Sequence, residues 1–151
     1  MISRSRCPIA MLGPALLMLI MTSSVQAADF STTEVTISYA EPSHQAQPLF
    51  IFARGTPIEA VVVLDAWVKV RDSEGKLSWM QRSALSTKRK VIVQQPHTAI
   101  RQNPESNSAI AFYAEPHVIL DWLPGAPPGW VKVQAANRSA GFARLADVWG
   151  E

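Results

Sequence analysis

A four-residue segment that occurs twice places the strongest constraint on how this chain folds. Trp-Val-Lys-Val stands at residues 67–70 and again at 130–133, an offset of 63. The same offset relates Ser78 and Trp79 to Gly141 and Phe142. Because two features share one spacing, the chain is predicted to consist of two similar units in tandem.

Upstream of these segments the match between the two halves is looser. Residues 56–59 align with 115–118 at an offset near 59 or 60. We attribute the difference to extra residues in the proline-rich segment 123–129, because insertions are tolerated in loops.

Both units are predicted to consist of short strands. Residues 67–71 and 130–134 alternate apolar and polar side chains, which is typical of half-buried strands. Further strands are expected at 35–37, 58–64, 77–81, 91–93, 117–122 and 140–144. Turns are expected at 72–75, where Gly75 can take a positive φ, and at 135–139. The 11 prolines leave room only for single helical turns, near 83–85 and 145–147.

The central hairpin resembles that of bacterial SH3-like (SH3b) domains. The resemblance rests on Trp-Val-Lys-Val-Arg-Asp at 67–72, the turn with Gly75, and Ser-Trp-Met at 78–80. Residues 54–59 resemble the lead-in to the adjacent strand of that family, and residues 99–104 resemble its opening segment. Ala66, Ser78 and Phe142 stand where the family commonly has Gly, Gly and Trp.

The resemblance implies an all-β chain of two tandem small half-open barrels. We expect a first SH3-like domain at 28–86, a linker at 87–90 and a second domain at 91–151. Units of about 60 residues are near the lower limit for independent folding, so we expect the two to pack on each other. The family also implies attachment to cell-wall or peptide ligands.

The first 27 residues have the layout of a signal peptide. Arg4 and Arg6 precede an apolar run, which ends in small residues that predict cleavage between Ala27 and Ala28. The alternative, an uncleaved membrane anchor, requires about 20 apolar residues, and this run is shorter. We therefore expect a helical signal peptide at 1–27, export to the periplasm or beyond, and a soluble mature form that does not span a membrane.

Charge and cysteine content restrict the function of the mature chain. The sequence has 14 Lys+Arg and 12 Asp+Glu. Removing Arg4 and Arg6 leaves 12 of each sign, which argues against a nucleic-acid surface. The single cysteine, Cys7, lies in the signal peptide. The basic run 88–90 is interpreted as a solvated linker rather than a phosphate site.

Aromatic residues are the best candidates for ligand contact. Trp67 and Trp130 begin strands beside loops, where an indole can be half exposed. Trp122 adjoins the proline-rich loop, and Tyr113 completes the candidate set. The predicted core consists of the alternating residues Val68, Val70, Trp79, Val131, Val133 and Phe142.

No catalytic or metal-binding constellation is evident in the sequence. His44, His97 and His117 lack partners at the spacing of zinc ligands. Neither a serine nucleophile motif nor a carboxylate pair with separated environments is recognisable. We therefore expect neither an enzyme nor a cofactor.

Three functional hypotheses follow. The first is a non-catalytic module that recognises a peptide or a peptidoglycan component in the cell envelope. The second is a structural or assembly partner of another envelope protein, which would expose a contiguous apolar patch. The remote third is an envelope hydrolase.

Overall fold

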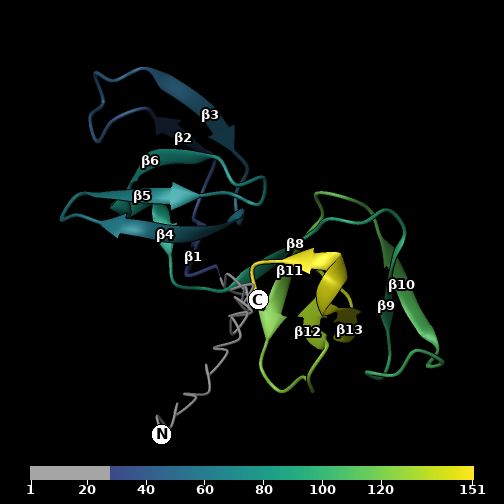
Figure 1. Ribbon diagram of the computed structural model, residues 1–151. Coiled ribbons are helices and arrows are strands. Elements are labelled where there is room, and N and C mark those ends of the chain that lie inside the picture. The colour runs from purple at the N-terminus through teal and green to yellow at the C-terminus, as the bar shows by residue number, and fades with distance from the viewer. Residues whose placement is uncertain (1–27) are drawn as a thin grey trace, which may run out of the picture.

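The computed structural model describes residues 28–151 (Figure 1). The predicted signal peptide, its helical segment and the Ala27 side of its cleavage site lie outside the described residues. The chain forms two seven-stranded antiparallel sheets, one for each half. The predicted all-β class with two SH3-like units is therefore confirmed.

The first sheet uses the strands before residue 87. Its strands are β1 (Phe30–Thr32), β2 (Thr36–Tyr39), β3 (Pro48–Phe52), β4 (Pro57–Val63), β5 (Trp67–Arg71), β6 (Leu77–Gln81) and β7 (Leu85–Ser86). The 3₁₀ helix η1 (Arg82–Ala84) separates the last two strands. The order across the sheet is β3-β2-β6-β5-β4-β1-β7.

The second sheet repeats this arrangement. Its strands are β8 (Lys90–Val93), β9 (Thr98–Arg101), β10 (Ile110–Ala114), β11 (Ile119–Leu123), β12 (Trp130–Gln134), β13 (Gly141–Arg144) and β14 (Val148–Trp149). The 3₁₀ helix η2 (Leu145–Asp147) stands where η1 does in the first half. The order β10-β9-β13-β12-β11-β8-β14 is the same as in the first sheet when each strand is advanced by seven. Both predicted helical turns are confirmed.

Equivalent backbone hydrogen bonds show that the turns of the two units have the same geometry. The amide of Arg82 donates to Ala66 O at 3.0 Å, and the amide of Leu145 donates to Gly129 O at 3.0 Å. In the same way Gly55 N donates to Thr32 O and His117 N donates to Val93 O, at 2.8 and 2.9 Å.

These pairs correct the alignment of the upstream segments. Gly55 corresponds to His117, an offset of 62, and both adopt a positive φ, of 82° and 69°. The predicted offset of 59 or 60 was wrong. The offset changes only from 62 to 63 across the β4–β5 and β11–β12 hairpins, a difference of one residue. His117 accordingly lies in a turn before β11, not in a strand as predicted.

Each unit has its own core, built from one face of the central strands. Val68 and Val70 are fully buried with Ile58 and Met80. Val131 and Val133 are buried in the second core with Ile100, Leu120 and other residues. The apolar residues of β5 and β12 recur with period two, so they all point to the same side, and burying each valine contributes roughly 1.5 kcal/mol or more.

Trp79 and Phe142 were predicted in the core, and the structure corrects this. Residues opposite each other in antiparallel strands share a face of the sheet. Val68 is opposite Met80, whereas Trp79 is opposite Lys69. Trp79 and Phe142 therefore lie half-buried on the outer face, where the Lys69 and Lys132 ammonium groups stand 5.9 and 6.0 Å from their rings.

The linker between the units is docked on β11 rather than solvated. Lys90 Nζ donates to Asp121 Oδ1 at 2.6 Å, and Lys88 Nζ lies 3.1 Å from the same oxygen. Between them, the Arg89 guanidinium lies 4.1 Å from the centre of the Trp122 ring. The interpretation of 88–90 as a solvated linker is thus wrong for Arg89 and Lys90, although Lys88 is 66% exposed.

The two units contact each other on both sides of this linker. A Cβ atom placed on Gly55 would lie 3.1 Å from Lys90 Cδ and 3.7 Å from Ile119 Cγ2. Gly150 is equally close to the first unit, since its Cβ would lie 3.1 Å from Pro57 Cβ and 3.3 Å from Ala28 Cβ. Glycine allows a close backbone approach in both places. Figure 1 shows the C-terminal strand beside this junction.

Within residues 28–151, no helix has the length and apolar character needed to cross a bilayer.

Gly141 provides a test of the second core. A Cβ at this position would lie 2.6 Å from Ile100 Cγ2 and 2.9 Å from the Arg101 carbonyl oxygen. We expect Gly141→Ala to lower the free energy of unfolding by roughly 1–3 kcal/mol, the usual cost of overpacking. Urea unfolding followed by circular dichroism measures the change.

Ser78 is the matched control, because it occupies the corresponding position in β6 and already carries a Cβ. Ser78→Ala should change stability by less than about 1 kcal/mol, within the ordinary range for such substitutions. Equal effects of the two variants would contradict the packing account.

Asp121 provides a test of the docked linker. Hydrogen bonding to Lys90 is the main reason that the pKa of Asp121 lies below its ordinary value. A depressed pKa means that the carboxylate stabilises the fold above its unfolded-state pKa and ceases to do so as the pH falls through the folded-state pKa. We expect Asp121→Asn to cost about 0.5–1 kcal/mol at pH 7, allowing for its partial exposure.

The same substitution should cost almost nothing at a pH well below the folded-state pKa, where Asp121 is protonated in both states. Urea unfolding at neutral and strongly acidic pH gives the comparison, with Glu105→Gln as an exposed control. A cost that persists unchanged in acid would rule out the ion pairs as its cause.

Candidate functional site

A cluster of aromatic rings surrounds Trp67 on the first unit. Trp67 is half-buried at the start of β5, and Tyr39 of β2 meets its ring edge-on at a centroid distance of 5.7 Å. His44, from the β2–β3 loop, lies 5.0 Å from the Trp67 ring and 5.9 Å from the Tyr39 ring. The Gln81 amide nitrogen donates to His44 Nε2 at 2.6 Å. We call these four residues the Trp67 cluster.

The fold itself brings these residues together. Trp67 and Gln81 are opposite each other in the β5–β6 ladder, and Tyr39 is opposite Trp79 on the other side of β6. The β2–β3 loop then brings His44 to the end of the same strands. Beside the cluster is an open pocket of about 210 Å³, lined by Tyr39, His44, Gln81 and residues from Glu34 to Ile37, with Ala84.

Trp130 occupies the corresponding place in the second unit with different neighbours. Arg144 is opposite Trp130 in the β12–β13 ladder, and its guanidinium lies 6.0 Å from the Trp130 ring. Arg144 also donates to Ser106 Oγ at 2.9 Å. Arg101, at the position of Tyr39, donates to the Ser108 carbonyl at 2.7 Å. We call Ser106, Trp130 and Arg144 the Trp130 cluster.

The two clusters therefore share a scaffold but differ in chemistry. The Trp67 cluster offers ring faces, a phenol, an imidazole and an amide. The Trp130 cluster offers one indole and the guanidinium of Arg144, which is suited to a carboxylate or another planar anion. Sequence reasoning identified the two tryptophans but missed Tyr39, His44, Gln81, Arg101, Ser106 and Arg144.

Trp122 and Tyr113, the other candidate ligand residues, are not part of either cluster. Trp122 packs on the second core and is covered by Arg89. It therefore anchors the linker. Tyr113 is 60% exposed on the edge strand β10. Within residues 28–151, the structure records no ring contact between Tyr113 and either Trp122 or Trp130.

Two carboxyl groups outside the clusters have shifted pKa values. An ammonium contact from Lys76 lowers the pKa of Glu74 in the exposed β5–β6 turn. Burial raises the pKa of Glu151 at the junction. In the part of the chain that the structure describes, no three His, Cys, Asp or Glu side chains are grouped as metal ligands.

Apolar side chains are exposed on the outer side of β2 and β3. Ile51 is 74% exposed and is opposite Ile37, which is also exposed. Pro48, Leu49 and Phe50 border the same surface. Because β3 is the last strand of its sheet, this face adjoins a free strand edge.

A comparison with protein-family models matches most of the first unit. Residues 34–87 match the family model described as bacterial SH3 domain. No curated protein matches the chain. Among solved structures, NlpC2 and NlpC1 of Trichomonas vaginalis are similar with TM-scores of 0.37 each, at 10% and 13% identity. The similar regions cover 85% and 90% of this chain but 50% of each of those, so the chain spans about half of their length.

Proposed function

We propose that this protein, whose first unit is a bacterial SH3 domain, is an exported, non-catalytic module that binds a short peptide in the cell envelope, such as the peptide portion of peptidoglycan. The observation that supports this most strongly is the half-buried tryptophan at the same strand start in both units. Each indole is flanked by a side chain from the neighbouring strand, Gln81 or Arg144, that makes a hydrogen bond to a loop residue. Such aromatic anchors commonly supply most of the affinity at peptide sites.

The chemistry of the Trp67 cluster suits the neutral part of a peptide. Its rings provide apolar contact at little entropic cost, because aromatic side chains have only two rotatable bonds. Gln81 and His44 provide donors and acceptors for a peptide backbone. The adjoining pocket, with Thr36 and Ile37 in its wall, offers space for one small side chain.

The chemistry of the Trp130 cluster suits a carboxylate. A guanidinium binds a carboxylate through two parallel hydrogen bonds, and Arg144 is held beside the indole by Ser106. The two units would then recognise different groups, which are neutral at Trp67 and anionic at Trp130. A peptide with free carboxylates, like that of peptidoglycan, can supply both.

Binding to purified peptidoglycan tests the proposal. The full-length chain is expressed with residues 1–27 in place and recovered from the envelope fraction, where an N-terminus at Ala28 checks the predicted cleavage. We expect the protein to sediment with insoluble peptidoglycan. Trp67→Ala should weaken retention by about tenfold, since a lost aromatic anchor typically costs more than 1 kcal/mol.

His44→Ala is the companion variant, because His44 is exposed and its replacement leaves the core intact. Trp79→Ala is the matched control, a half-buried tryptophan of the same sheet outside the cluster. Thermal unfolding verifies that each variant is folded. The proposal fails if the unaltered protein stays in the supernatant, or if Trp79→Ala weakens retention as much as Trp67→Ala.

The exposed apolar face of β2 and β3 favours a second candidate function, binding of another envelope protein along the free edge of β3. A partner strand could pair with this edge and cover Leu49 and Ile51. A photo-crosslinking amino acid at position 51 should capture a discrete partner in cells, and Leu49→Glu should abolish the adduct.

The matched control places the same crosslinker at Tyr113, which is exposed on β10 of the second unit. Adducts at both positions, or at neither, would count against a specific role for β3.

A further inference from the structure

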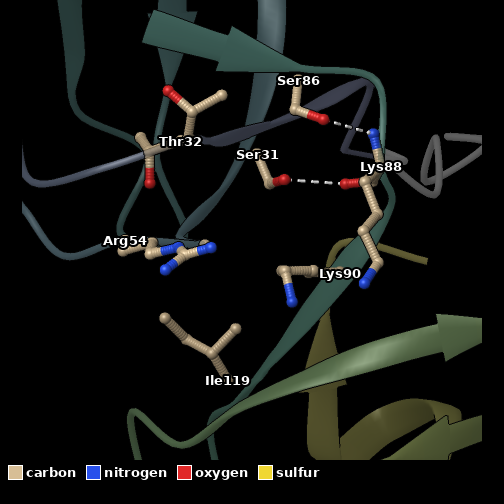
Figure 2. A pocket seen from close by; sticks show the side chains of 9 residues that line it. Ser31, Thr32, Arg54, Ser86, Lys88, Lys90 and Ile119 are labelled. Atoms are coloured by element: carbon tan, nitrogen blue, oxygen red, sulfur yellow. Dashed lines mark hydrogen bonds between the residues drawn. The ribbon is translucent and has the colours of Figure 1, made fainter.

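A polar pocket lies at the junction of the two units, away from both tryptophan clusters. Its volume is about 440 Å³, and it is lined by Ser31, Thr32, Thr33, Arg54, Gly55, Ser86, Lys88, Lys90 and Ile119. Figure 2 shows Arg54 on one side of the space, Lys88 and Lys90 on the other, and Ile119 below. We call this space the junction pocket.

The junction pocket carries an excess of positive charge. Arg54, Lys88 and Lys90 all line it, whereas Asp121 is the one carboxylate bound to them, through its contacts with the two lysines. Within residues 28–151, the structure records no carboxylate within 4.0 Å of the Arg54 guanidinium. Two positive charges therefore remain uncompensated around one space.

The walls of the pocket are held in place by hydrogen bonds. Ser31 Oγ donates to the Lys88 carbonyl at 2.7 Å, and the Lys88 amide donates to Ser86 Oγ at 3.1 Å. Both bonds appear in Figure 2 and fix the backbone that carries Lys88. Thr32 Oγ1 donates to the Ala53 carbonyl at 2.6 Å, next to Arg54. Only Ser86 keeps a hydroxyl proton free to donate.

Lys90 is also positioned by packing. Its side chain is 21% exposed, and its stem crosses Gly55, where an added Cβ would lie only 3.1 Å from Lys90 Cδ. The ammonium is thus presented from a stem held between Gly55 of the first unit and Asp121 of the second. A cation with so little freedom loses little entropy on binding an anion.

We propose that the junction pocket binds a phosphate monoester group. The group carries a charge of about −1.5 to −2 at neutral pH and three strong acceptor oxygens, which matches two uncompensated positive charges and the available donors. Arg54 contributes a two-pronged donor, Lys88 and Lys90 contribute point charges, and Ser86 contributes a hydroxyl. A carboxylate carries a single negative charge and would neutralise only one of the two uncompensated positive charges.

A bound phosphate group would connect parts of the chain that are far apart in sequence. Arg54 belongs to the turn before β4, and Lys88 and Lys90 belong to the linker docked on β11. The ligand would therefore join the first unit to the linker and, through Asp121, to the second unit. Binding should raise the stability of the paired units as well as occupy the site.

Titration of inorganic phosphate into the full-length protein tests the proposal, with backbone amide spectra as the readout. We expect saturable shifts at Gly55, Lys88 and Lys90, and none of comparable size with acetate at the same ionic strength. Arg54→Gln should weaken phosphate binding by about tenfold, the usual effect of losing a charge-assisted hydrogen bond. Lys88→Gln, at an exposed position, should act in the same direction.

Arg138→Gln is the matched control, because Arg138 is an exposed arginine of the second unit outside the pocket. Two further arms identify the source of the phosphate group: glycerol phosphate in solution, and phosphatidylcholine vesicles with and without phosphatidic acid. Binding confined to the vesicles with phosphatidic acid indicates a lipid headgroup, whereas binding of glycerol phosphate indicates a soluble ligand. Absence of saturable shifts with inorganic phosphate, or equal binding by Arg54→Gln and Arg138→Gln, overturns the proposal.

Discussion

The arrangement of the two units depends on the attachment of three successive basic residues, Lys88 to Lys90, to one strand, β11. Asp121 Oδ1 forms ion pairs with both Lys88 and Lys90. The neighbouring Trp122 makes a cation–π contact with Arg89. Three successive basic residues thus each have a partner within two successive residues of β11. Each contact is modest by itself, since partly exposed ion pairs and cation–π contacts contribute about 1 kcal/mol or less. Together they fix the direction in which the chain enters the second sheet.

The two units share one backbone arrangement but carry different side chains around their tryptophans. The same strand order and the same turn hydrogen bonds recur in both units. The residue types around each tryptophan differ, because Tyr39 corresponds to Arg101 and Gln81 corresponds to Arg144. These side chains stand at strand ends and in loops, where a change of residue leaves the core intact.

The sequence predicted most accurately what depends on local periodicity. Alternation in Trp-Val-Lys-Val correctly indicated that Val68 and Val70 share a face. The frequent prolines, which leave room only for single helical turns, correctly indicated the two 3₁₀ helices. The placement of Trp79 failed because the register between β5 and β6, and not alternation alone, decides which face of β6 is inside. Met80 is opposite the buried Val68, so Trp79 is directed outward.

The candidate site was less predictable because it depends on contacts between distant segments. His44 lies in a loop without any local signal, and only the Cα pairing of β5 with β6 and of β2 with β6 brings it to Trp67. An accurate repeat offset would have helped, since 62 residues relate Tyr39 to Arg101. The role of the basic linker was missed for a similar reason. Its partners, Asp121 and Trp122, lie some thirty residues away in the chain.

The left-handed turn that precedes β4 and β11 limits how such units can be joined. In the first unit the turn residue is Gly55, and the missing side chain leaves room for the stem of Lys90. In the second unit the corresponding residue is His117, whose imidazole would occupy that room. The close approach that joins the second unit to the first therefore uses a glycine that the second unit does not repeat.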